Sequence, residues 1–202
     1  MTAGGRERSR LDVGGDDGAS YLISMESNPR QWVVRRATVD DAAAIAAVAS
    51  AAWSDTYAGL LHSETIEALV RSAYSPERLV NRITSNHLYV ASGDGPVVAF
   101  ADAQVLSDRI VLGAIYALPQ LRGQGAGTAL LKALLAALPP LPMTADVVAD
   151  NRKGEVFYER RGFVPREPLH ADLFGEAVVE RRWWRDDDDR ATARIGCSSH
   201  LP

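Results

Sequence analysis

The hydrophobic and polar positions of this chain follow two periods, one typical of strands and one typical of amphipathic helices. Short apolar runs predict β-strands at 33–36, 88–92, 97–105, 109–117, 144–149, 163–168 and 177–184. Apolar residues that recur every three or four positions predict helices that begin after 38 and 75, and helices over 63–72, 125–138 and 153–161. This order of elements predicts an α+β fold with a mixed, mostly antiparallel central sheet flanked by helices on both faces.

Particular residues mark two helix starts and one hairpin turn. Thr38 and Asp41 have the spacing of a capping box, in which each side chain accepts a hydrogen bond from the other residue's backbone N–H. Ser75 precedes Pro76, as expected for an N-cap followed by the first helical position. The glycine-rich turn at 93–95 separates two strand patterns and therefore predicts a hairpin.

The same pattern predicts a tail, one domain and a second tail. Residues 1–30 are rich in Gly, Asp, Arg and Ser, and we expect them to be a disordered extension. Residues 31–185 carry the periodic pattern, and the length of 202 residues suits one domain. Residues 186–202 begin with four aspartates and are expected to be a disordered acidic and polar tail. Translation could begin at Met1 or at Met25, which precedes the periodic region.

Composition argues against several classes of protein. The formal net charge of −4 gives no general reason to bind nucleic acid. No apolar run approaches the roughly 18 residues that a membrane helix needs, so no membrane association is expected. The single cysteine, Cys197, gives no disulfide framework and favours the cytoplasm as the compartment. The four histidines are isolated and lack metal-ligand spacing, so no metal is expected.

The most informative segment joins the strand at 109–117 to the following helix through a glycine turn, 122–128. Glycines let the backbone approach an anion closely, and the first N–H groups of a helix have no partner within the helix. Arg122 adds a positive charge at this turn. The segment therefore predicts a binding site for a phosphate or pyrophosphate.

Two nucleotide motifs fit this turn poorly. A dinucleotide-binding fold requires G-x-G-x-x-G, but the third glycine, Gly127, comes one residue early. Asp146 lies at about the distance of a ribose-binding acid, yet inside its strand and not at the strand's end. A Walker loop requires a lysine after the glycines, and none is present. A tight turn without a ligand remains an alternative for the glycines alone.

A second segment, 151–163, follows the next predicted strand. Arg-x-x-Gly-x-Gly at 122–127 and Asn-x-x-Gly-x-x-Phe-Tyr-x-x-x-Gly-Phe at 151–163 together resemble the two signature segments of the GNAT superfamily, the acyl-CoA-dependent N-acyltransferases. The resemblance extends over about residues 32–185 and implies the acyl-CoA N-acyltransferase fold. Gly154 stands where the family more often has alanine, which is expected to weaken the start of this helix.

The resemblance implies acetyl-CoA as a co-substrate. In this family the glycine turn binds the pyrophosphate, and the preceding strand pairs with the pantetheine arm through main-chain hydrogen bonds. Tyr158 matches the tyrosine that the family places beside the thioester sulfur, and is the predicted catalytic residue. The residues expected to bind acetyl-CoA are Ile115, Tyr116, Ala117, Arg122, Gly123, Gln124, Gly125, Ala126, Gly127, Thr128 and Asn151.

Acyl transfer to an amine requires a neutral nucleophile and a stabilised leaving thiolate. A lysine-like amine with a pKa of about 10.4 is almost fully protonated at pH 7, so a base is needed. Tyr158 is a weaker acid than a thiol, and we interpret it first as a stabiliser of charge on the sulfur and second as a proton donor. Many relatives have a glutamate on the strand before the glycine turn, where this chain has none. Asp102 and Asp55 are the nearest candidate bases, and neither is assigned.

The first choice of acceptor is the primary amine of a small molecule, polyamine-like amines included. The stretch 50–83 resembles one in polyamine acetyltransferases, and Asp55, Glu64 and Glu67 could form a negative pocket with 53–57 and 169–176 beside it. A protein or peptide N-terminus or lysine is one alternative, and a CoA-binding sensor module without catalysis is another. A Rossmann oxidoreductase is a weaker one. Formation of a homodimer through the exposed final strands remains an open alternative.

Overall fold

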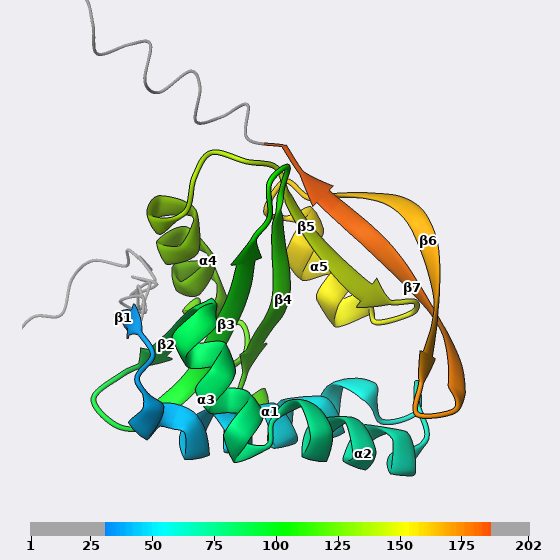
Figure 1. The fold of residues 1–202 in the computed structure, drawn as a ribbon, viewed down its shortest axis with the longest axis horizontal. Helices are drawn as coiled ribbons and strands as arrows, with labels where there is room; N and C mark the ends of the chain where they lie inside the picture. The colour runs from blue at the N-terminus through cyan, green and yellow to red at the C-terminus, as the bar shows by residue number, and fades with distance from the viewer. Residues whose placement is uncertain (1–30, 187–202) are drawn as a thin grey trace, which may run out of the picture.

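A seven-stranded sheet runs through the computed structural model, which describes residues 31–186 (Figure 1). The order is β1-β2-β3-β4-β5-β7-β6, and every neighbouring pair is antiparallel except β4 and β5. This arrangement confirms the predicted fold class. The strands are β1 (Val33–Arg36), β2 (His87–Ser92), β3 (Val97–Val105), β4 (Ile110–Ala117), β5 (Met143–Val148), β6 (Val164–Leu173) and β7 (Glu176–Arg185).

Helices cover both faces of the sheet, as predicted. Consecutive residues of β3 show this division, because Phe100 packs in one apolar cluster while Ala99 and Ala101 pack in the other. The first cluster lies under α1, α2 and α3, and the second lies under α4 and α5. None of the helices within 31–186 is long and apolar enough to cross a membrane. The helices are α1 (Ala42–Tyr57), α2 (Ser63–Ala73), α3 (Pro76–Ser85), α4 (Ala126–Ala137) and α5 (Arg152–Glu159), with 3₁₀ turns η1 (Val39–Asp41) and η2 (Pro119–Leu121).

The predicted helix starts are confirmed. The Thr38–Asp41 capping box forms at the turn that leads into α1, with the Thr38 N–H donating to Asp41 Oδ2 at 2.8 Å. Ser75 Oγ accepts the N–H of Arg78 at 3.3 Å and caps α3. These local rules act over a few residues, which is why the sequence alone revealed them.

The final hairpin is longer than the predicted strands 163–168 and 177–184. β6 continues to Leu173, and β7 begins at Glu176. Pro165 and Pro168 interrupt the sequence pattern, and the pairing of β6 with β7 shifts register between them. The predicted extension 1–30 and the tail from 187 onward lie outside the described residues, as do Met25 and Cys197.

The sheet opens between β4 and β5. These two parallel strands share only two residue pairs, Ile110 with Met143 and Val111 with Thr144. Beyond Val111, β4 continues to Ala117 with β3 as its partner on the other side. Within residues 31–186, the main-chain edge of β4 that faces β5 is therefore left without a strand partner over its second half (Figure 1).

Candidate active site

The glycine turn places the first turn of α4 at this opening. Gly123 and Gly125 have φ values of 76° and 94°, a left-handed conformation that favours glycine. Gly125 is the N-cap of α4, and no acidic side chain lies in the first helical turn. The unsatisfied N–H groups of this turn carry about half a positive charge, which stabilises an anion.

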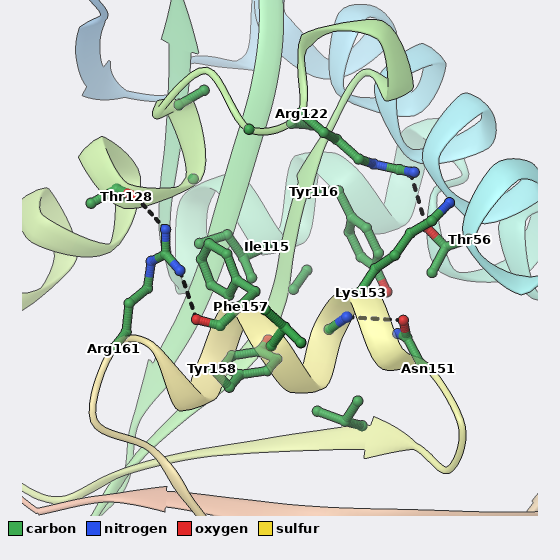
Figure 2. A pocket seen from close by; sticks show the side chains of 18 of the residues that line it. Thr56, Ile115, Tyr116, Arg122, Thr128, Asn151, Lys153, Phe157, Tyr158 and Arg161 are labelled. Carbon is green, nitrogen blue, oxygen red and sulfur yellow. Dashed lines mark hydrogen bonds between the residues drawn. The ribbon is translucent and has the colours of Figure 1, made fainter. Parts of the chain in front are cut away.

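Arg122 turns away from these amides toward α1. Its guanidinium forms an ion pair with Asp55 and donates to Thr56 Oγ1 at 2.9 Å and to the Ala52 carbonyl at 3.2 Å (Figure 2). Asp55 also accepts a hydrogen bond from Lys153 Nζ at 3.0 Å, so one carboxylate bridges the glycine turn and the start of α5. The two cations hold the pKa of Asp55 below its usual range, Lys153 contributing most. A phosphate-binding role for the Arg122 side chain remains a prediction.

Tyr158 lies on α5 and is 8% exposed. Its ring packs edge-on against Phe157 and Phe163, with ring centroids 5.3 and 5.1 Å away. Burial, with smaller contributions from Tyr57 and Asp146, raises the pKa of the Tyr158 phenol well above 10. The hydroxyl therefore keeps its proton at neutral pH and can act as a hydrogen-bond donor.

A pair of phenols faces Tyr158 from the other side of the opening. The hydroxyls of Tyr57 on α1 and Tyr116 on β4 lie 3.4 Å apart. Burial is the main cause of the raised pKa of both, and Tyr158 adds to the effect at Tyr116. Trp53 stacks on Tyr57 with ring centroids 4.2 Å apart, so these two aromatics of the predicted acceptor segment are also part of the core.

Asn151 holds the start of α5. Its side-chain oxygen accepts the N–H of Gly154 at 3.0 Å, and it also hydrogen-bonds to Tyr57. A β-carbon on Gly154 would lie 2.8 Å from the Asn151 amide nitrogen. Gly154, which is expected to weaken the start of the helix, therefore makes room for the residue that caps it.

These groups surround one cavity of about 620 Å³. Every predicted site residue lines it except Gln124, whose carbonyl accepts the Trp32 indole N–H at 2.7 Å. The unpaired edge of β4 at Ile115–Ala117 runs along the cavity between the glycine turn and Tyr158 (Figure 2). An acyl-CoA fits these features, because its diphosphate matches the helix amides and its pantetheine amides match a free strand edge.

The cavity wall also carries charged residues that sequence reasoning did not single out. Arg161 donates to the Phe157 carbonyl at 2.7 Å and to Thr128 Oγ1, and its guanidinium stacks 3.7 Å from the Phe157 ring centroid (Figure 2). Four basic side chains and two acidic ones line the cavity, although the whole chain has a net charge of −4. They are Arg122, Lys153, Arg160 and Arg161, and Asp55 and Asp146. This local excess of positive charge suits an anionic ligand.

Neither of the two candidate bases, Asp102 and Asp55, has a carboxylate free to accept a proton from the acceptor amine. Asp102 is buried on β3 away from the cavity, where it accepts hydrogen bonds from Arg82 at 2.7 Å and Asn86 at 3.1 Å. Asp55 is held by its two cations. Glu64 and Glu67 lie on the exposed face of α2 and do not line the cavity, so the predicted negative pocket does not form from them.

Comparisons with known proteins agree in linking this chain to acetyltransferases. Residues 84–165 match the model of the GNAT acetyltransferase domain, a stretch that includes both signature segments. A spermidine N(1)-acetyltransferase from Thermoplasma acidophilum is 26% identical over 156 residues, which cover 73% of this chain and 97% of that protein.

Two solved structures share the fold. The PaiA N-acetyltransferase of Thermoplasma acidophilum in complex with coenzyme A has a TM-score of 0.63 at 24% identity, covering 75% of this chain and 98% of its own. A GCN5-related N-acetyltransferase from Rhodopseudomonas palustris has a TM-score of 0.64 at 24% identity, covering 76% and 94%.

The splayed sheet, the glycine-capped helix and the buried tyrosine define an acyltransferase with the acyl-CoA N-acyltransferase fold. As the resemblance in sequence predicted, residues 84–165 match a GNAT acetyltransferase domain, and the chain is an N-acetyltransferase.

Proposed function

We propose that this protein transfers the acetyl group of acetyl-CoA to the primary amine of a small molecule, with polyamine-like amines as the first class of acceptor. One observation carries the proposal: helix amides, a free strand edge and a buried phenol line the same cavity, in the order that a coenzyme diphosphate, pantetheine arm and thioester require. When bound, acetyl-CoA supplies the activated thioester.

Different residues along the cavity bind different parts of acetyl-CoA. The amides of Gly123 to Thr128 bind the diphosphate, and Ile115 to Ala117 align the pantetheine arm. Tyr158 donates a hydrogen bond to the departing sulfur, where negative charge develops. Its raised pKa makes complete proton transfer to the thiolate unfavourable, which supports stabilisation of charge as its main role.

A contact between the β6–β7 hairpin and the segment between α1 and α2 supports a small-molecule acceptor over a protein acceptor. Glu176, at the start of β7, accepts the backbone N–H of His62 at 3.1 Å and lies 2.9 Å from His62 Nδ1. This contact joins the β6–β7 hairpin to the segment between α1 and α2 (Figure 1). A protein or peptide acceptor would call for an open groove between these elements. The name of the curated relative, a spermidine acetyltransferase, supports the same choice.

Release of free thiol from acetyl-CoA with a panel of amines tests this function. The panel contains spermidine, a short diamine, lysine, and a peptide with a free N-terminus. We expect turnover with the small amines, and a loss of about 10²-fold in kcat in Tyr158→Phe. Tyr89→Phe is the matched control, because Tyr89 lies on β2 outside the cavity lining.

Calorimetry with coenzyme A separates catalysis from binding. Tyr158→Phe is expected to bind coenzyme A as the natural chain does. Binding without thiol release for any amine would favour the sensor module, and no affinity for coenzyme A would refute the proposal. Turnover with the peptide alone would favour the protein acceptor.

A further inference from the structure

Glu180 is an acidic residue in an inward-facing position of β7. Side chains alternate along this strand, and Val178, two residues before, is buried in the cluster under α1, α2 and α3. Glu180 pairs with Val148, at the end of β5 where the strand leads toward Asn151 and α5. Burial of an ionised carboxylate costs free energy unless a partner stabilises its charge. An acid on the buried face of a strand is therefore a candidate for a functional residue.

Its surroundings connect Glu180 to the acceptor end of the cavity. The carboxylate is close enough to Tyr57 for its charge to raise the pKa of that phenol. Tyr57 in turn hydrogen-bonds to Asn151 and lies 3.4 Å from Tyr116, and all three line the cavity. Glu180 itself does not line the cavity, so a proton from an amine bound there would reach its carboxylate through a bridging water.

Glu180 differs from the other acids of this region in its partners. Asp55 and Asp146 are each paired with basic side chains, and Glu176 accepts from His62. Within 31–186, no hydrogen bond or ion pair joins another residue to the Glu180 carboxylate. Burial first, and then the charge of Asp146, raise the pKa of Glu180 above 4.5, while Arg182 opposes the shift. Such a carboxylate is a stronger proton acceptor than an exposed one.

We propose that Glu180 is the proton acceptor for the attacking amine, acting through a water between its carboxylate and the Tyr57 hydroxyl. This inference rests on the proposed function. The ammonium form of the acceptor gives one proton through the water to Glu180. The free nitrogen then bonds to the thioester carbonyl carbon as the carbon–sulfur bond breaks. The second proton leaves the nitrogen for the departing thiolate, and Glu180 returns its proton to solvent. The products are the amide, a free thiol and one proton.

The dependence of kcat/KM on pH tests the proposal, measured with the best amine of the panel. The groups that face Glu180 are Asp146 on β5, Arg182 on its own strand and the phenol of Tyr57 on α1, with Tyr116 beyond it. In the natural chain, kcat/KM is expected to rise with pH up to the pKa of Glu180 and then to level off, because Glu180 must be ionised to accept the proton of the ammonium form. In Glu180→Gln this acid-side bend disappears and kcat falls by about 10²-fold.

Three further variants complete the design. Glu180→Asp is expected to restore part of the rate and the bend. Tyr57→Phe retains the ring but removes the hydroxyl that positions the water, and should lower kcat with an unchanged affinity for coenzyme A. Glu167→Gln alters an exposed carboxylate of the same hairpin and should behave as the natural chain.

Two results would overturn the assignment. One is a Glu180→Gln variant that keeps both its rate and the acid-side bend. The other is a variant whose amine KM rises while kcat and the bend are unchanged, since Glu180 would then hold the ammonium group only. Should Glu180→Gln fail to fold, as judged by thermal unfolding, an unaltered kcat in both Tyr57→Phe and Glu180→Asp would overturn it. Absence of thiol release in the natural chain is the separate failure of the proposed function.

Discussion

A β-carbon placed on Gly127 would lie 2.9 Å from the ring of Phe157. This contact joins the first turn of α4 to α5, and so brings the two signature segments of the sequence together. Phe157 has little freedom to move, because Arg161 stacks on its ring and donates to its carbonyl. The glycine is therefore required here for close approach between helices, and not for an unusual backbone conformation.

Gly127→Ala should lower both stability and coenzyme affinity. Alanine gains up to about 1 kcal/mol from helix propensity, but overpacking against Phe157 costs about 1–3 kcal/mol. We expect a net loss of about 1 kcal/mol in the free energy of unfolding, measured in urea. Gly95→Ala is the control, since a β-carbon there meets nothing within 4 Å. An unchanged free energy of unfolding in Gly127→Ala would show that Phe157 moves aside freely.

Removal of the Asp55 charge should strengthen binding of coenzyme A. Asp55 holds Arg122 and Lys153 at the cavity, and its negative charge opposes that of a phosphate. In Asp55→Asn we expect affinity for coenzyme A to rise about two- to threefold at low ionic strength. The gain should shrink in about 0.5 M salt, which screens exposed charges. Calorimetry at the two ionic strengths measures both effects, and weaker binding at low salt would contradict the argument.

Asp41 should contribute stability that is lost in acid. Arg35 is the main cause of its low pKa, which falls to about 2 from 3.8. Because the folded pKa is the lower one, the stabilisation is fully present above pH 4 and disappears as the pH falls toward 2. Asp41→Asn should cost about 1–2 kcal/mol at pH 7, less than the shift implies because Arg35 is half exposed.

Urea unfolding at pH 7 and pH 2.5 measures this contribution. The difference in free energy of unfolding between the natural chain and Asp41→Asn should narrow at the lower pH. Asp40→Asn, an exposed neighbour, is the control. A difference that stays constant between the two pH values would assign the effect to the capping bond with Thr38 and not to the charge.

Local signals made most of the fold predictable. Capping at Thr38 and Ser75 depends on residues three positions apart, so the sequence displays it directly. The length of the final hairpin was not predictable, because Pro165 and Pro168 hide the strand pattern and only pairing with β7 maintains it. The parting of β4 from β5 after two residue pairs is likewise a tertiary feature.

The backbone features of the cavity were predictable, and the directions of its side chains were less so. The glycine turn was predicted from its spacing and Tyr158 from the resemblance to the second signature segment, and both line the cavity. The direction of Arg122 depends on Asp55, 67 positions earlier in the chain, which no local pattern reveals. The sequence pattern does indicate Glu180, because it places an acid two residues after the buried Val178 and therefore on the same face of the strand.

The two prolines of β6 also affect how copies of the chain could meet. β6 is the outermost strand of the sheet, and at Pro165 and Pro168 it has no N–H to offer a neighbour. A strand from another molecule would lose hydrogen bonds there, so the first half of this border resists edge-to-edge aggregation. Any self-association that extends the sheet on this side would have to use the stretch nearer Leu173.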